Sequence, residues 1–229
     1  MREPEIDQIT EKACLVCTWD DEENCLDCEI KERLDCRWEQ SLLLRFYKGG
    51  GLAIISAVIA FIITGFFVSW VPALIYIIFW IFFFGFFEIR VLCSHCPYYA
   101  KDGRILHCLA NHGTIKVWKY HPEPMNLFEK FGFLVGAFFF VFFPFVTELY
   151  SIVILQHQDI LLANILIILA FISIVGGIYL FYVLQKNICP KCVNFSCPLN
   201  KVSKEIVDAY LKKNLVMREA WETAGYRID

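Results

Sequence analysis

The sequence predicts an all-α membrane protein with four transmembrane helices and a cysteine-rich, metal-binding head on the cytoplasmic side. Three observations predict this fold class. The chain of 229 residues is 58% hydrophobic, its apolar residues fall into long blocks, and its eleven cysteines all lie outside those blocks. A helix needs about 20 apolar residues to cross the hydrocarbon core of a bilayer. Blocks of that length favour membrane spans over a soluble core.

The apolar blocks cover Leu52–Phe87, Phe131–Val146 and Ile160–Leu184. The first block is long enough for two crossings, and Pro72 stands at its middle. Because proline starts a helix well and continues one badly, we expect a turn and a new helix at Pro72 rather than one long kinked helix. The predicted spans are 51–70, 72–89, 131–149 and 160–184.

Basic residues flank the predicted spans on one side only. They precede the first span, fill the loop between the second and third, and follow the fourth: Arg45, Lys48, Arg90, Lys101, Arg104, Lys116, Lys119, Lys130, Lys186, Lys191, Lys201 and Lys204. The stretch Glu148–Asp159 on the other side holds no Lys or Arg. Cytoplasmic flanks carry the excess of basic residues. We therefore expect an integral protein of the cell membrane or another energy-transducing membrane, with both termini cytoplasmic.

The chain divides into five expected segments. These are an N-terminal cysteine-rich cytoplasmic segment at 1–48, a transmembrane hairpin at 49–90, a cytoplasmic cysteine loop at 91–130, two spans at 131–185, and a cytoplasmic cysteine cluster with an amphipathic helix at 186–229. In the last segment Val202, Ile206 and Tyr210 recur at helical spacing, and Asn214 interrupts the pattern before a short final helix at Val216–Thr223. We expect these helices to pack against the head, with the membrane surface as the alternative.

No ionisable residue is expected deep in a span, because Glu88 and Glu148 fall at predicted span ends. Pumps and proton-coupled transporters usually keep ionisable groups at membrane depth, so this pattern argues against transport. Phenylalanine dominates the second and third spans instead. We interpret it as packing and lipid-facing surface, with a quinone or another apolar ligand between the helices as the alternative. Gly132 and Gly136 form a GxxxG pair that predicts a close helix contact.

Two CxxC pairs lie near the start of the chain, Cys14 with Cys17 and Cys25 with Cys28. A two-residue spacer can turn both sulfurs toward one metal, and four thiolates bind zinc, a single iron or a four-iron cluster. We predict a metal site at these four residues. Cys36 lies eleven residues after Cys25, as Cys25 lies eleven residues after Cys14. Its role is left open between a spare thiol, an alternative ligand and part of another site. A bound metal would also explain how a segment with few large apolar side chains becomes ordered.

The juxtamembrane loops supply the other candidate ligands, which are Cys93, Cys96, Cys108 and His112 in the central loop and Cys189, Cys192 and Cys197 after the fourth span. The central loop alone provides three thiolates and one imidazole, a common zinc set. The last cluster needs a fourth ligand, from His95, His107 or a thiol across the bundle. The cytoplasmic ends of spans two and four can be neighbours in a four-helix bundle. The six thiols are therefore predicted to build one composite site or two adjacent sites.

Proline follows Cys96, Cys189 and Cys197 directly, as it follows the last cysteine of ferredoxin-type runs. The two loops are similar to those of the four-span membrane iron–sulfur subunits that accompany anaerobic oxidoreductases, which carry repeated C-x3-C-P loops beside their helices. The central loop is one residue shorter than that repeat. The resemblance implies an iron–sulfur cofactor, with 4Fe–4S as the first expectation. Because C-P-x-C also suits a zinc knuckle, zinc is the alternative and free thiols are the third interpretation.

The function expected from these features is that of a membrane-anchored iron–sulfur protein, which transfers electrons at the cytoplasmic face. Its partners would be the lipid bilayer, a protein redox partner and, in one version, a quinone. A zinc-stabilised membrane scaffold or adaptor is the first alternative. A thiol–disulfide oxidoreductase using Cys189 with Cys192, or Cys93 with Cys96, is the second, which the reducing cytoplasm disfavours. No nucleic-acid partner is expected, because the basic residues lie at span ends, where topology explains them.

Overall fold

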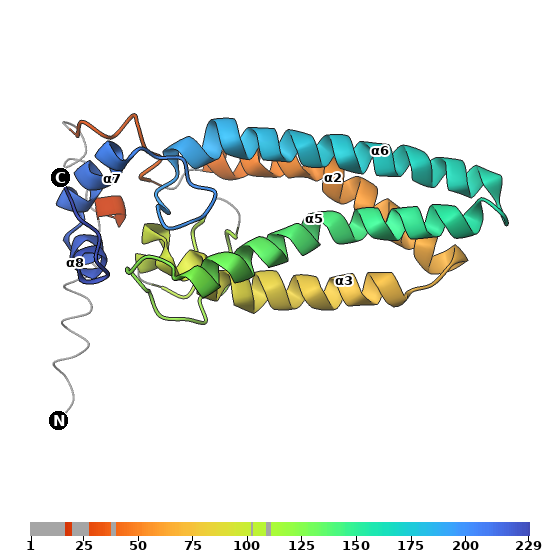
Figure 1. Ribbon diagram of the computed structural model, residues 1–229, viewed down its shortest axis with the longest axis horizontal. Coiled ribbons are helices and arrows are strands. Elements are labelled where there is room, and N and C mark those ends of the chain that lie inside the picture. The colour runs from red at the N-terminus through yellow and green to blue at the C-terminus, as the bar shows by residue number, and fades with distance from the viewer. Residues whose placement is uncertain (1–16, 20–27, 38–39, 102, 109–110) are drawn as a thin grey trace, which may run out of the picture.

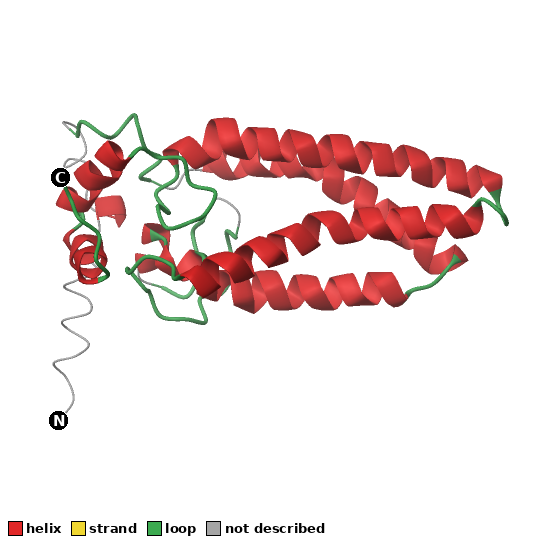
Figure 2. Ribbon diagram, in the orientation of Figure 1, coloured by secondary structure: helices red, strands yellow, loops and turns green. Residues whose placement is uncertain are grey.

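The computed structural model describes residues 17–19, 28–37, 40–101, 103–108 and 111–229. Four long helices lie side by side along its longest axis (Figure 1): α2 (Gln40–Phe67), α3 (Val71–Phe82), α5 (Leu127–Leu155) and α6 (Ile160–Val183). Short helices and loops gather at one end of them (Figure 2). All regular elements of the described residues are helical. Four helical stretches are long and apolar enough to cross a membrane, which confirms the four-span, all-helical prediction.

The turn between the first two spans is built as predicted. The helix α3 begins at Val71 with Pro72 in its first turn, where the missing amide proton costs nothing. The ring of Trp70 covers Gly65 of α2, and a Cβ atom at that glycine would lie 2.6 Å from the ring. A glycine is therefore required where the turn folds back on α2.

The third span is longer than predicted, and this changes the position of Glu148. A capping box starts α5, in which Asn126 and Glu129 each accept a hydrogen bond from the other's backbone amide at 2.9 Å. The helix then continues to Leu155. The expectation that Glu148 lies at a span end is therefore wrong. Its side chain is buried, with 1% of its surface exposed.

Glycine positions set the closest approaches between the helices. The predicted GxxxG contact exists, but aromatic rings occupy it, because Gly132 faces Phe87 and Gly136 faces Phe83. Between α2 and α6 the backbones themselves meet. A Cβ atom at Gly176 would lie 2.7 Å from the amide nitrogen of Ala53 and 3.0 Å from its Cα. Small residues allow such close packing in membrane bundles, where dispersion replaces the hydrophobic effect between helices.

A proline inside α5 is matched by a tyrosine from α3. Pro144 has no amide proton, so the carbonyl of Phe140, four residues earlier, loses its helical donor. The hydroxyl of Tyr76 donates to that carbonyl at 3.0 Å. The Tyr76 ring also stacks on Phe143, with centroids 5.9 Å apart and planes 3° from parallel. A neighbouring helix thus satisfies the group that the proline exposes, as the bilayer interior demands.

The head has a hydrophobic core of its own, built around α7 (Lys204–Lys213) and α8 (Leu215–Thr223). Tyr210 and Trp221 of these helices pack with Ile30 and Leu34 of the N-terminal segment. Asn214 separates the two helices and caps the second, accepting from the Met217 amide at 3.1 Å. The predicted interruption and the predicted packing on the head are both confirmed.

Asp208 of α7 holds the last residues of the described chain. Its carboxylate accepts hydrogen bonds from Lys204 at 2.7 Å, from the Tyr226 hydroxyl at 2.9 Å and from the Asp229 amide at 3.3 Å. Burial opposes ionisation of Asp208, but these donors outweigh it and lower the pKa of the carboxyl. The segment after α8 is therefore fixed to the head by a carboxylate that must be ionised.

Candidate metal centre

The second and fourth spans end in the same way, immediately before their cysteines. Each α-helix passes into a π-helical segment, and each chain segment later reaches a 3₁₀ turn that opens on a cysteine. After α3 the order is η3 (Phe83–Phe87), a short α-helical turn α4 (Glu88–Val91) and η4 (Cys93–His95). After α6, η7 (Cys189–Lys191) follows η6 (Leu184–Ile188) directly. The second cysteine of each CxxC is extended, with φ −87° and ψ 137° at Cys96 and φ −75° and ψ 127° at Cys192. The two motifs are local structural repeats, although their spans share no sequence pattern. Single-turn π segments are frequent at functional sites.

The buried Asn194 joins the two loops, and the half-buried Asn200 braces the second loop internally. The side-chain amide of Asn194 donates to the carbonyl of Leu92, the residue before Cys93, at 3.0 Å. That of Asn200 donates to the Cys192 carbonyl at 2.7 Å and to the Asn194 carbonyl at 3.0 Å. The loops that follow spans two and four are therefore neighbours, as the sequence allowed.

The thiols of both loops belong to one interacting group. Burial raises the pKa of the Cys96 thiol well above its usual value, and Cys192 raises it further because two nearby thiolates repel. Cys108 and Cys197 act on Cys96 in the same way. Burial and then Cys197 raise the pKa of Cys192, and burial raises that of Cys197 to about 11. Cys93 is hydrogen-bonded to Cys108.

Backbone amides point at the same sulfurs. The Tyr98 amide bonds to the Cys96 sulfur and the Asn194 amide to the Cys192 sulfur. The Cys197 sulfur accepts hydrogen bonds from the backbone amides of Leu199 and Asn200. These donors act against burial, because a hydrogen bond to the ionised form favours it. They offset the effect of burial only in part, because the pKa of each of these thiols remains raised.

The N-terminal cysteines are described in part. Cys14 and Cys25 lie outside the described residues, while Cys17, Cys28 and Cys36 are half-buried and pack against the core of the head. Asp35, beside Cys36, joins both juxtamembrane loops. Its amide donates to the Lys191 carbonyl at 2.8 Å, and its carbonyl accepts from the Tyr98 hydroxyl. The described parts of all three cysteine clusters therefore meet at one end of the bundle.

No disulfide joins two of the described cysteines. Within the described part of the chain, no three Cys, His, Asp or Glu side chains are close enough together to hold one metal ion. The predicted ligand His112 is half-buried beside His107, with ring centroids 5.2 Å apart. The structure brings the six juxtamembrane thiols into one region without gathering them around a single point.

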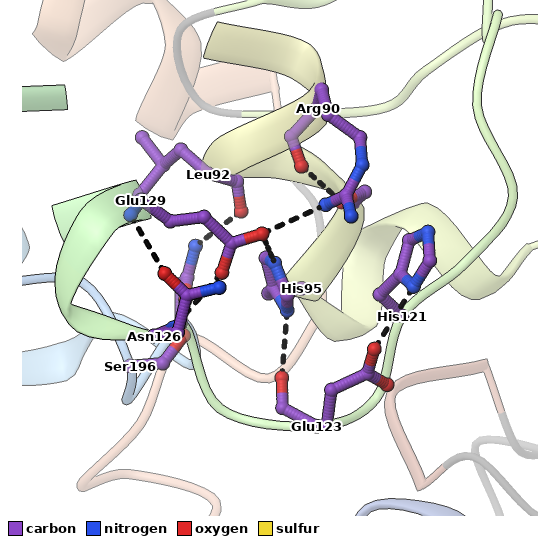
Figure 3. Close-up of polar contacts among 10 residues, drawn as sticks. Arg90, Leu92, His95, His121, Glu123, Asn126, Glu129 and Ser196 are labelled. Atoms are coloured by element: carbon purple, nitrogen blue, oxygen red, sulfur yellow. Dashed lines mark hydrogen bonds and ion pairs between the residues drawn. The ribbon is translucent and has the colours of Figure 1, made fainter. Parts of the chain in front are cut away.

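His95 belongs to a polar network that holds α5 against the central loop (Figure 3). Its Nδ1 donates to the Glu123 carbonyl at 2.7 Å, and its Nε2 lies 3.5 Å from the Glu129 carboxylate. Arg90 pairs with the same carboxylate at 3.0 Å. Nδ1 of this buried histidine is therefore occupied, whereas Nε2 has no hydrogen-bond partner among the described residues.

A carboxyl group beside the thiols was missed by sequence reasoning. Glu88 is buried, with 5% of its surface exposed, and accepts a hydrogen bond from the Asn111 side chain at 2.6 Å. The same Asn111 nitrogen lies 3.4 Å from the sulfur of Cys93. An acidic residue one turn before a CxxC motif was the available signal. Asn111 could not have been found this way, because its contact depends on how the central loop folds back.

An apolar groove of about 410 Å³ lies between α2 and α3, and Phe140 of α5 contributes to its lining. Phe61, Trp70, Tyr76 and Trp80 contribute to its wall. Its wall is formed by membrane-spanning segments and by Trp70, and no cysteine or histidine of the described chain lines it.

No protein-family model matches this chain, and no curated protein or solved structure is similar to it. The four spans and the thiol group are therefore the features from which a function is inferred. Both are properties of the described residues themselves.

Proposed function

We propose that the chain is a membrane-anchored electron-transfer protein whose juxtamembrane thiols bind an iron–sulfur cluster on the cytoplasmic side. The observation that carries the proposal is the meeting of two CxxC loops, whose second cysteines share an extended backbone, in one group of interacting thiols. The proposed ligands are Cys96, Cys108, Cys192 and Cys197, because Cys96 interacts with the three others. Four thiolates are the usual ligand set of a 4Fe–4S cluster.

A cluster tolerates more widely spaced sulfurs than a single metal ion does. Zinc binds thiolates at about 2.3 Å, so four sulfurs around it would be about 3.8 Å apart. The described thiols interact with one another but do not gather that closely around one point. The cysteines of a cluster bind different irons and stand farther apart. Zinc in a structural role is the second candidate, favoured by the separate hydrophobic core of the head.

Thiol–disulfide exchange fits less well. The nucleophile in that reaction is an exposed thiolate. Cys96 is buried, and burial raises its pKa, so its reactive form is disfavoured at neutral pH. The amide donors to the sulfurs and the side-chain bonds of Asn194 and Asn200 are typical of loops that hold a ligand.

The proposed orientation places the head in the cytoplasm. It rests on the basic residues that flank the spans at the cysteine-rich end and are missing from Glu148–Asp159. Labelling of intact cells with a membrane-impermeant thiol reagent tests it. Protection in intact cells and reaction after permeabilisation are expected, whereas labelling from outside would invert the topology. A soluble or membrane-bound redox protein is the proposed partner, and a quinone would need a site near the head.

The first experiment is purification without oxygen, followed by a visible spectrum and analysis of iron, acid-labile sulfide and zinc. The proposal expects brown protein with equal iron and sulfide. Cys96→Ser and Cys192→Ser should each lower the iron content severalfold while the protein still inserts in the membrane. The matched control is Ser94→Ala, which changes the same loop but keeps both cysteines, and it should retain the metal.

Two results would count against this proposal. Colourless protein with stoichiometric zinc would replace electron transfer with the scaffold role. Iron that persists at full content in both cysteine variants would remove the juxtamembrane group and move the site to the N-terminal cysteines. Cys36→Ser should matter less than Cys28→Ser, and equal loss would identify Cys36 as a ligand.

A further inference from the structure

A carboxyl group lies inside the membrane bundle, where three helices meet. Glu148 of α5 is 1% exposed and accepts a hydrogen bond from Ser173 of α6 at 2.9 Å. Ser173 in turn lies 2.9 Å from Ser56 of α2, oxygen to oxygen. Ser56 reaches the backbone carbonyls of Leu52 and Ala53, each at 3.0 Å. One continuous hydroxyl chain therefore connects the carboxyl to the backbone of α2.

No positive charge accompanies this carboxyl. The Oε2 atom of Glu148 is buried, and no described residue donates a hydrogen bond to it. The side chains that make the described hydrogen bonds of this part of α2, α5 and α6 carry hydroxyls, namely Ser56, Thr64, Thr147, Ser151 and Ser173. No Lys, Arg or His of the described chain interacts with Glu148.

An unpaired carboxylate at this depth is strongly disfavoured, since neither water nor a counter-ion stabilises its charge. A proton removes that cost and needs no additional space. The hydroxyl geometry also fits the protonated form. With the proton on Oε1, the carboxyl donates to Ser173, Ser173 donates to Ser56, and Ser56 donates to the Leu52 carbonyl. Every hydroxyl then donates once, and no donor is left over.

We propose that Glu148 is a proton-binding site inside the membrane bundle, and that its proton exchanges toward the head through Ser173 and Ser56. The hydroxyl chain from Glu148 to Ser56 leads toward the head, because α2 starts at the head and Leu52 lies near the head-side boundary of its span. In one passage the O–H bond at Glu148 breaks as one forms at Ser173, and the Ser173 proton moves to Ser56. The Ser56 hydroxyl then turns from the Leu52 carbonyl and gives its proton to a water molecule, which the proposal requires to enter from the head side. The reverse sequence reloads the site.

The buried Glu148 contradicts the expectation that no ionisable residue lies deep in a span. The absence of such residues therefore no longer argues against proton coupling. The inference is independent of the proposed iron–sulfur function, because it uses no cysteine and no metal.

Infrared difference spectroscopy of the purified, membrane-reconstituted protein tests the site. The wild-type spectrum minus that of Glu148→Gln should contain the carbonyl stretch of a protonated carboxylic acid at neutral pH. The subtraction isolates Glu148 from Glu88, the buried carboxyl near the cysteines. Ser173→Ala should move this band to higher wavenumber, because the carboxyl loses its hydrogen-bond acceptor. A spectrum with carboxylate bands alone at Glu148 would overturn the proposal, and the wild-type and Ser173→Ala samples decide it even if Glu148→Gln does not fold.

The exchange path is tested by the rate at which the same band shifts in heavy water. Ser56→Ala interrupts the chain and should slow the shift at least tenfold. Thr64→Val is the matched control, since Thr64 lies on the same helix and bonds Ser151 of α5 at 2.8 Å, outside the chain. Equal exchange rates in Ser56→Ala, Thr64→Val and wild type would exclude the proposed path.

Discussion

Substituting Gly176 with alanine should weaken the contact between α2 and α6. The new Cβ atom would lie 2.7 Å from the amide nitrogen of Ala53, whereas ordinary contact begins at 3.4 Å. The helices would have to separate by about 0.7 Å, because the obstacle is backbone and cannot rotate away. Ser173 and Ser56 lie one turn from these residues, and their 2.9 Å hydrogen bond would stretch to about 3.6 Å, beyond a usable length.

The expected loss follows from three contributions. Overpacking costs about 1–3 kcal/mol, and a lost hydroxyl bond between membrane helices costs about 0.6 kcal/mol. The higher helix propensity of alanine returns up to about 1 kcal/mol. The free energy of unfolding should therefore fall by about 1–3 kcal/mol, as measured by reversible unfolding in mixed detergent micelles.

The adjacent Gly177 provides the control. A Cβ atom there would meet nothing within 4 Å. Gly177→Ala gains the same helix propensity without the clash and should leave stability unchanged or raise it by up to about 1 kcal/mol. If Gly176→Ala proved as stable as Gly177→Ala, the close approach of α2 and α6 would be wrong.

Three further predictions concern single hydrogen-bonded groups. Tyr76→Phe should lower the free energy of unfolding by about 0.6–1.7 kcal/mol in the wild-type protein. In the Pro144→Ala protein the same substitution should cost almost nothing, because the restored amide of residue 144 donates to the Phe140 carbonyl. Equal losses in the two proteins would contradict this. Asn194→Ala should release the second cysteine loop from Leu92 and speed alkylation of the buried thiols severalfold, whereas unchanged rates would show that other contacts hold the loop. The donors that lower the pKa of Asp208 contribute stability that is complete above about pH 4 and is lost as the pH falls through the pKa of the folded state. The difference in Tm between wild type and Asp208→Asn should therefore shrink in acid. A difference that stays constant with pH would refute this linkage.

The spans and their turn could be predicted because hydropathy and proline chemistry act within short segments. Pro72 opens α3 and Asn214 caps α8 for reasons that neighbouring residues already contain. Boundaries were less accurate. The apolar run after Phe131 was ended near Glu148, although Ile152, Val153 and Ile154 continue it and α5 extends to Leu155. One acidic residue was taken as a boundary because its partner, Ser173, lies on another helix.

The candidate site was predicted as a set of residue types but not as a set of contacts. Cysteine spacing indicated pairs that could share a metal, and the common side of the clusters followed from span counting. Which thiols meet depends on Asn194, whose bond to Leu92 joins segments about a hundred residues apart. Glu88 and Asn111 entered the site only through that folding.

The sequence by itself determined the number of spans, the helical class and the end of the bundle at which the cysteines gather. These properties arise from the bilayer as solvent, which acts on each segment separately according to its length and polarity. The tertiary structure decided that Cys96 faces Cys192 and that Glu148 is enclosed by hydroxyls rather than exposed at a span end. Both depend on which helix faces meet. In a membrane those faces are selected by close packing at residues such as Gly176 and by hydrogen bonds between helices, neither of which hydropathy along one segment contains.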